Sequence, residues 1–92
     1  MCGIFGYVGE RDDAARVVLG GLKRLDYRGY DSWGIAVLSQ GELKVQKHTG
    51  KIADVGEHFP LLAYRSQRAI GHTRWATHGG VTKRNAHPHT SC

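Results

Sequence analysis

The stretch GIAVLSQGELKVQKH, residues 34–48, decides the fold more than any other part of this chain. Residues 34–39 form a nearly continuous apolar run of strand length. A Gln-Gly turn follows at Gln40 and Gly41, and residues 42–48 then alternate apolar and polar side chains, as a second strand does. The stretch therefore predicts an antiparallel β-hairpin.

Outward from the hairpin, the expected elements are a strand at residues 2–8, a helix opened by Asp12 and Asp13 and stopped at Arg28-Gly29, a short helix at residues 51–58 that ends before Pro60, a strand at residues 68–74 and a loop from Trp75 onward. Gly20 and Gly21 lie inside the expected long helix, where each costs about 1 kcal/mol relative to alanine. Close packing against a neighbouring layer is the expected compensation. This order of strands and helices predicts an α+β fold.

Composition and charge fit a small globular unit. The 92 residues are 40% hydrophobic and 23% charged, and 13 Lys and Arg against 8 Asp and Glu give a net charge of +5. That sign favours anionic partners, although the basic residues are scattered as on an ordinary solvated surface. The N-terminus carries no leader and no run reaches membrane-spanning length, so a cytoplasmic protein without a membrane partner is expected. The polar end at Cys92 suggests a fragment.

Cys2 directly follows the initiator, so removal of Met1 would leave a thiol and a free α-amino group on one residue. An amine that titrates near ~8 can take the proton from a thiol that titrates near ~8.5, and no histidine is needed. Glycines around Ile4 and Phe5 suit a short buried strand whose start is approached closely. The duller interpretation is a small residue that leads into a strand.

Three stretches resemble the glutaminase domain of the N-terminal-nucleophile, or class II, glutamine amidotransferases. They are CGIFG at 2–6, YRGYDS at 27–32 with GIA at 34–36, and HTRWATHG at 72–79 with NAHPH at 85–89. The second and third are most similar to the branch that aminates fructose 6-phosphate. The resemblance implies an N-terminal-nucleophile hydrolase fold, a four-layer αββα sandwich, of which residues 1–92 are an incomplete N-terminal part.

The resemblance also implies roles for particular residues. Cys2 would be the nucleophile that attacks the glutamine amide and releases ammonia. Arg74 would hold the α-carboxylate of glutamine, a task that suits a planar, always-charged fork. The other implied positions are Trp75, Thr77 and His78 in the substrate pocket, and Arg28 and Gly3 in supporting places. No cofactor and no metal are implied.

The family's Asn-Gly oxyanion hole, its amine-binding acid and its sugar isomerase domains are expected after residue 92. The expected partners are glutamine and, through the missing domain, fructose 6-phosphate, in a homo-oligomeric parent that binds no nucleic acid. The 92 residues alone are expected to be inactive. Strands such as residues 34–39 are expected to lack a neighbour on one edge and a facing sheet on one side.

Other interpretations stay open. The parent could be another class II amidotransferase, or the chain a noncatalytic basic binding module. A small cysteine-dependent hydrolase acting alone would need Gly79 and Gly80 as oxyanion donors. A zinc site would draw on His72, His78, His87, His89 and Cys92, but His-x-His without a paired Cys-x-x-Cys is a weak signal. Arg74 could be a surface ion-pair residue and Trp75 a core residue.

Overall fold

The computed structural model describes residues 3–25, 32–74 and 86–90. In chain order its elements are strand β1 (Gly3–Val8), helix α1 (Ala14–Leu25), strand β2 (Ser32–Ser39), strand β3 (Glu42–Thr49), the 3₁₀-helices η2 (Ile52–Asp54) and η3 (Pro60–Ala63), and strand β4 (Arg68–Arg74).

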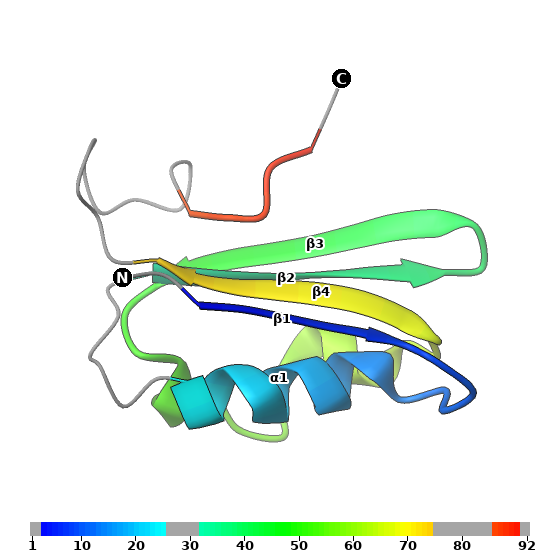
Figure 1. Cartoon of the computed structure of the whole chain (residues 1–92), viewed down its shortest axis with the longest axis horizontal. Helices are drawn as coiled ribbons and strands as arrows, with labels where there is room; N and C mark the ends of the chain where they lie inside the picture. The colour runs from blue at the N-terminus through cyan, green and yellow to red at the C-terminus, as the bar shows by residue number, and fades with distance from the viewer. Residues whose placement is uncertain (1–2, 26–31, 75–85, 91–92) are drawn as a thin grey trace.

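The four strands form one antiparallel sheet in the order β1-β4-β2-β3. Strand β4 therefore lies between the first two strands of the chain, so β1 joins the sheet only through residues 68–74. Figure 1 shows α1 along one face of this sheet. The α+β prediction is confirmed.

The hairpin of β2 and β3 has the turn that the sequence predicts. Ser39 pairs with Glu42, and between them Gln40 and Gly41 both have positive φ, 51° and 79°. Two left-handed residues in a two-residue loop match the right-handed twist of the flanking strands.

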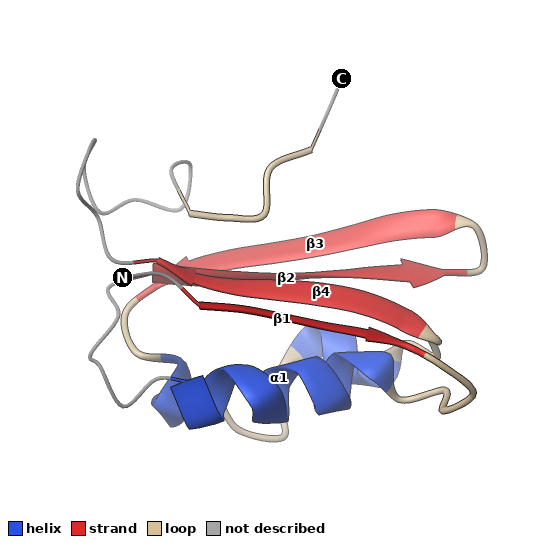
Figure 2. Cartoon of the chain, in the orientation of Figure 1, coloured by secondary structure: helices blue, strands red, loops and turns tan. Residues whose placement is uncertain are grey.

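The described helices all lie on one face of the sheet (Figure 2), and the hydrophobic core lies between them and that face. Trp33 contributes an aromatic contact to Phe59, with ring centroids 5.3 Å apart. The buried core side chains come from α1 (Ala14, Ala15, Val18, Leu19, Leu22), β2 (Trp33, Ile35, Val37), the 3₁₀ segments (Ile52, Phe59, Leu61) and β4 (Ala69). These side chains pack α1 and the 3₁₀ segments against β2 and β4.

The expected helix at residues 51–58 is wrong. Only Ile52–Asp54 is helical there, as a 3₁₀ turn, and a second turn begins at Pro60, where the helix was expected to have ended already. Lys51 supplies no side-chain cap, and the chain closes a short-range bond from the Val55 N–H to the Ile52 carbonyl (3.0 Å). Proline suits a first helical position because no N–H is needed there.

The structure describes the start of the long helix and residues 86–90 of the expected C-terminal loop. α1 begins after Asp13, whose carbonyl accepts the Val17 N–H, and extends to Leu25. The predicted stop at Arg28-Gly29 lies outside the described residues, as do 75–85 of the predicted loop. Residues 86–90 have no regular structure.

The expectation that residues 34–39 lack a neighbouring strand on one edge is also wrong, because β2 has β4 on one edge and β3 on the other. The expectation that one face of the sheet lacks a facing sheet agrees with the described residues. Ile4 (67% exposed), Val8 (79%) and Ile70 (48%) are in contact with solvent, and no second sheet covers them among the described residues. In the described part of the chain, no helix has the length and apolar character needed to cross a membrane.

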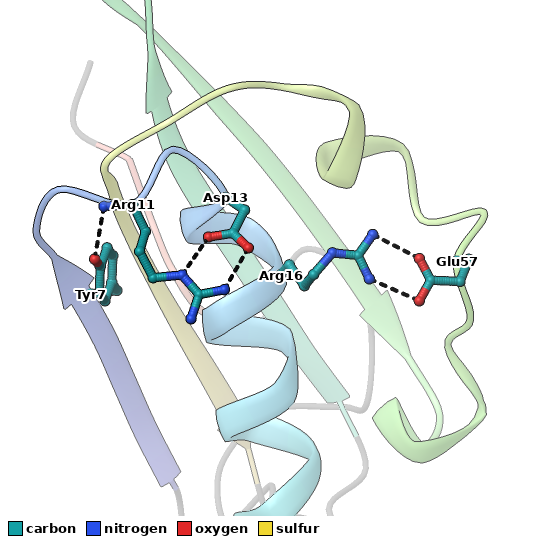
Figure 3. A network of polar contacts seen from close by, with 5 residues as sticks. All are labelled: Tyr7, Arg11, Asp13, Arg16 and Glu57. Carbon is teal, nitrogen blue, oxygen red and sulfur yellow. Dashed lines mark hydrogen bonds and ion pairs between the residues drawn. The ribbon is translucent and has the colours of Figure 1, made fainter.

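Two exposed ion pairs lie around α1, one within the turn that precedes it and one between α1 and the segment after η2 (Figure 3). Arg11 donates two hydrogen bonds to the Asp13 carboxylate (2.9 and 2.7 Å), and its backbone N–H donates to the Tyr7 hydroxyl (3.1 Å). Arg16 reaches across to Glu57 in the same two-pronged manner (2.8 and 2.7 Å). Each guanidinium lowers the pKa of its carboxylate, first through the hydrogen bond. Such solvated pairs orient segments more than they stabilise them.

The two helical glycines differ, and only one meets the expectation of close packing. A Cβ on Gly21 would lie 2.5 Å from the Phe5 ring, whereas a Cβ on Gly20 would meet nothing within 4 Å. Gly21 therefore lets α1 approach β1, whereas no close contact requires glycine at position 20.

We predict opposite signs for the two alanine substitutions. Gly20→Ala should stabilise the protein by about 0.5 to 1 kcal/mol through helix propensity. Gly21→Ala should destabilise it by roughly 1 kcal/mol, because overpacking against Phe5 exceeds that gain. Urea unfolding of both variants measures the difference. Equal effects would show that the Phe5 contact does not restrict Gly21.

Candidate functional site

Three strand ends meet at one end of the sheet. Gly3, the first residue of β1, pairs with Thr73, and Ser32, the first residue of β2, pairs with Arg74, the last of β4. Gly3 and Thr73 are buried and Arg74 is half-buried. A catalytic group at the start of β1 and a binding group at the end of β4 would thus share one edge.

Gly3 and Arg74 are the two predicted site residues that the structure describes, and the pairing brings them to the same end of the sheet. The others lie outside the described residues: Cys2, Arg28, Trp75, Thr77 and His78.

This end of the sheet also holds buried polar atoms that have no hydrogen-bond partner among the described residues: Ser32 Oγ, Thr73 Oγ1 and His72 Nδ1. An unpaired buried polar atom costs about 1 to 3 kcal/mol, and native proteins usually keep such atoms for a reason. Sequence reasoning missed Ser32 and Thr73 as site residues and named His72 only as a candidate zinc ligand. The available signal was their place inside the motifs at 27–32 and 72–79.

Residues 86–90 cover this end of the sheet on the face opposite α1, as Figure 1 shows. Ala86 is fully buried. The His87 carbonyl oxygen occupies the place where a Cβ on Gly34 would lie, and Pro88 Cδ would be 2.9 Å from that atom. Only glycine at position 34 permits this approach.

Three imidazoles contact one another in a row where this segment meets the sheet, and this row is called the stack below. The ring planes of His72 and His87 are tilted by 44°, and those of His87 and His89 meet edge to face at 61°. The rings of His72 and His87 have centroids 4.3 Å apart, and those of His87 and His89 4.5 Å apart. Burial, then the neighbouring His87 and Arg74, lowers the pKa of His72 to about 4. Burial followed by the charge of His89 lowers the pKa of His87 as well.

A hollow of about 310 Å³ lies beside the stack, bounded by Ile4, Ile70 and His72 from the sheet and His87 and His89 from the covering segment. Within the described ranges, no group of three His, Cys, Asp or Glu side chains is placed to hold a metal ion. His78 and Cys92, which the zinc interpretation needs, are outside those ranges.

Comparison with known proteins gives a consistent result. No family model matches the chain. It is 56% identical over 90 residues to a protein of Aquifex aeolicus, 55% over 91 residues to one of Thermus thermophilus and 57% over 93 residues to one of Streptomyces coelicolor, all named glutamine–fructose-6-phosphate aminotransferase (isomerizing). These alignments cover 97 to 99% of the chain but only 14 to 15% of each relative.

Two solved structures share the fold. One, described as the allosteric regulatory enzyme of purine biosynthesis, has a TM-score of 0.78 and 32% identity. The other, glutamine phosphoribosylpyrophosphate amidotransferase from B. subtilis with ADP and GMP, has a TM-score of 0.75 and 30% identity. Each match covers 96% of this chain and 18% of the other. The chain therefore has the fold of the N-terminal-nucleophile glutamine amidotransferases and is similar along its whole length to glutamine–fructose-6-phosphate aminotransferases.

Proposed function

We propose that this chain is the opening part of the glutaminase domain of a glutamine–fructose-6-phosphate aminotransferase. The observation that carries the proposal is identity of 51 to 57% along nearly the whole chain to enzymes of that name. The chain spans about 15% of their length, and under this proposal the rest of the site and the sugar-handling domains correspond to the part of those enzymes that it does not span.

The proposed chemistry begins at Cys2 once Met1 has been removed. The α-amino group takes the thiol proton, and the sulfur attacks the side-chain amide carbon of glutamine. The C–N bond breaks, the nitrogen leaves with a proton as ammonia, and a thioester remains. Water then hydrolyses the thioester to glutamate and the free thiol. The ammonia adds to the keto carbon of fructose 6-phosphate in the sugar domain of the full-length protein, the carbonyl oxygen leaves as water, and isomerisation gives glucosamine 6-phosphate.

The β1–β4 register supports this arrangement. Gly3 follows Cys2 in sequence and pairs beside Arg74, so a nucleophile and a carboxylate-binding cation would serve one small substrate. We assign Arg74 to the α-carboxylate of glutamine, since a guanidinium can bond both oxygens at once. Trp75, Thr77 and His78 follow in the chain and are proposed to line the same pocket, with Arg28 and Gly3 in support.

The partners follow from the same proposal. Glutamine binds the domain to which this chain contributes, and fructose 6-phosphate binds the domain that it lacks, in a cytoplasmic homo-oligomer. A second candidate, another class II amidotransferase, has support from the two structural neighbours at 30 to 32% identity. Formation of the amino sugar from fructose 6-phosphate and glutamine by the full-length protein distinguishes the two.

We predict that Cys2→Ala in the full-length protein lowers glutamine-dependent synthesis by roughly 10⁴-fold or more, because no other described or proposed group can form the thioester. A variant that retains Met1 should lose activity similarly, because the Cys2 nitrogen is then part of a peptide bond and cannot accept the thiol proton. Ammonium-ion release from glutamine is the measurement. Cys92→Ala is the matched control and should leave the rate unchanged. Near-normal hydrolysis with Met1 in place would contradict a role for the free amine.

We predict that Arg74→Lys weakens glutamine binding by about 1 to 3 kcal/mol, because the charge stays and the two-pronged geometry is lost. KM for glutamine should rise while the rate with saturating ammonia stays close to normal. Arg68→Lys, at the exposed start of the same strand, is the matched control. An unaltered KM in Arg74→Lys would remove Arg74 from the carboxylate site.

A further inference from the structure

The stack of His72, His87 and His89 joins two parts of the chain that are distant in sequence. His72 comes from β4 in the sheet, and the other two come from the covering segment, residues 86–90. The ring contacts, the burial of Ala86 and the close approach of His87 to Gly34 are the described contacts that dock this segment.

The surroundings of the stack offer no negative charge from the described residues. Arg74 from β4 and Lys47 from β3 are the other charged groups that act on it. The neighbouring strands contribute Ile4 and Gly34, which do not titrate. None of the described carboxylates contributes to the pKa of His72 or His87. A proton on His72 or His87 would therefore lie close to positive charge, with no carboxylate among the described residues to pair with that proton.

We propose that His72, His87 and His89 form an acid-released clasp. The clasp holds residues 86–90 against the sheet while the rings are neutral and releases them when a ring takes up a proton. His72 Nδ1, buried and unpartnered, would carry the least tolerable charge.

The direction of the pH dependence follows from the proton count. The docked His72 has a pKa of about 4, which burial and the charges of His87, Arg74 and His89 lower from the ordinary value near 6.5. Release of residues 86–90 removes the part of this shift that the segment causes, so the pKa of His72 rises toward the ordinary value. The released state therefore binds more protons between these two values, and docking is strongest above about pH 6.5 and weakens as the pH falls toward 4. After allowance for the partial exposure of the ring, the docking equilibrium constant should fall roughly tenfold between pH 7 and pH 5.

Hydrogen exchange in the full-length protein tests this clasp directly. Mass spectrometry of amide exchange gives a protection factor for the peptide that contains residues 86–90, corrected for the intrinsic pH dependence of exchange. That factor should fall roughly tenfold from pH 7 to pH 5, while the amides of β2 stay protected. Exchange at the imidazole C2 position gives the histidine pKa values in the same sample, and the pKa values of His72 and His87 should lie below the ordinary histidine value.

Variants separate the clasp from general acid sensitivity. His72→Phe keeps a ring without a proton site and should retain most of its protection at pH 5. Gly34→Ala should release the segment already at pH 7, whereas Gly6→Ala should not, because its Cβ would meet only the Ala69 carbonyl at 3.7 Å. His58→Gln should behave as the unmodified protein does. Equal protection at pH 7 and pH 5 in the unmodified protein would overturn the proposal, whether or not the variants fold.

Discussion

The insertion of β4 between β1 and β2 is the interaction on which the rest of the structure depends. It joins residues 3–8 to residues 68–74 and leaves β2 hydrogen-bonded on both edges. The same pairing sets Gly3 against Thr73 and Arg74 against Ser32, so the residue that follows the proposed nucleophile lies at the same end of the sheet as the proposed substrate anchor. Because this contact spans more than sixty residues of chain, its loop-closure cost must be met by the packing of α1 on the completed sheet.

The two faces of the sheet serve different purposes. The helical face holds the core, with Gly21 allowing α1 to approach Phe5. The opposite face is apolar and exposed at Val8 and Ile70, but at its other end Gly34 admits the backbone of His87. Glycine thus works in the same way on both faces, since each allows a close approach that a side chain would prevent. The candidate site lies where the second approach meets the three strand ends.

Local sequence signals predicted most of the strands, and tertiary contacts determined what they missed. The Gln40-Gly41 turn and the apolar run before it predict the hairpin because both signals act over a few residues. A single helix was predicted at residues 51–58, whereas the structure has 3₁₀ turns at 52–54 and 60–63, since nothing local shows that Phe59 packs on Trp33. The sequence does not distinguish Gly20 from Gly21, because only the fold brings Phe5 close to one of them. The contact between His72 and His87 likewise exists only in the folded chain. The roles of Cys2 and Arg74 came from motif resemblance and stay predictions.

The central claim is that Cys2, the residue before Gly3 in the sequence, is the thiol that reacts with glutamine. The most direct measurement is peptide mapping by mass spectrometry after the full-length protein reacts with a diazoketone analogue of glutamine. The account predicts a single adduct on a peptide that begins at Cys2 with Met1 removed, and excess glutamine should prevent it. An adduct elsewhere that glutamine does not prevent, or no adduct at all in a folded protein, would contradict the account.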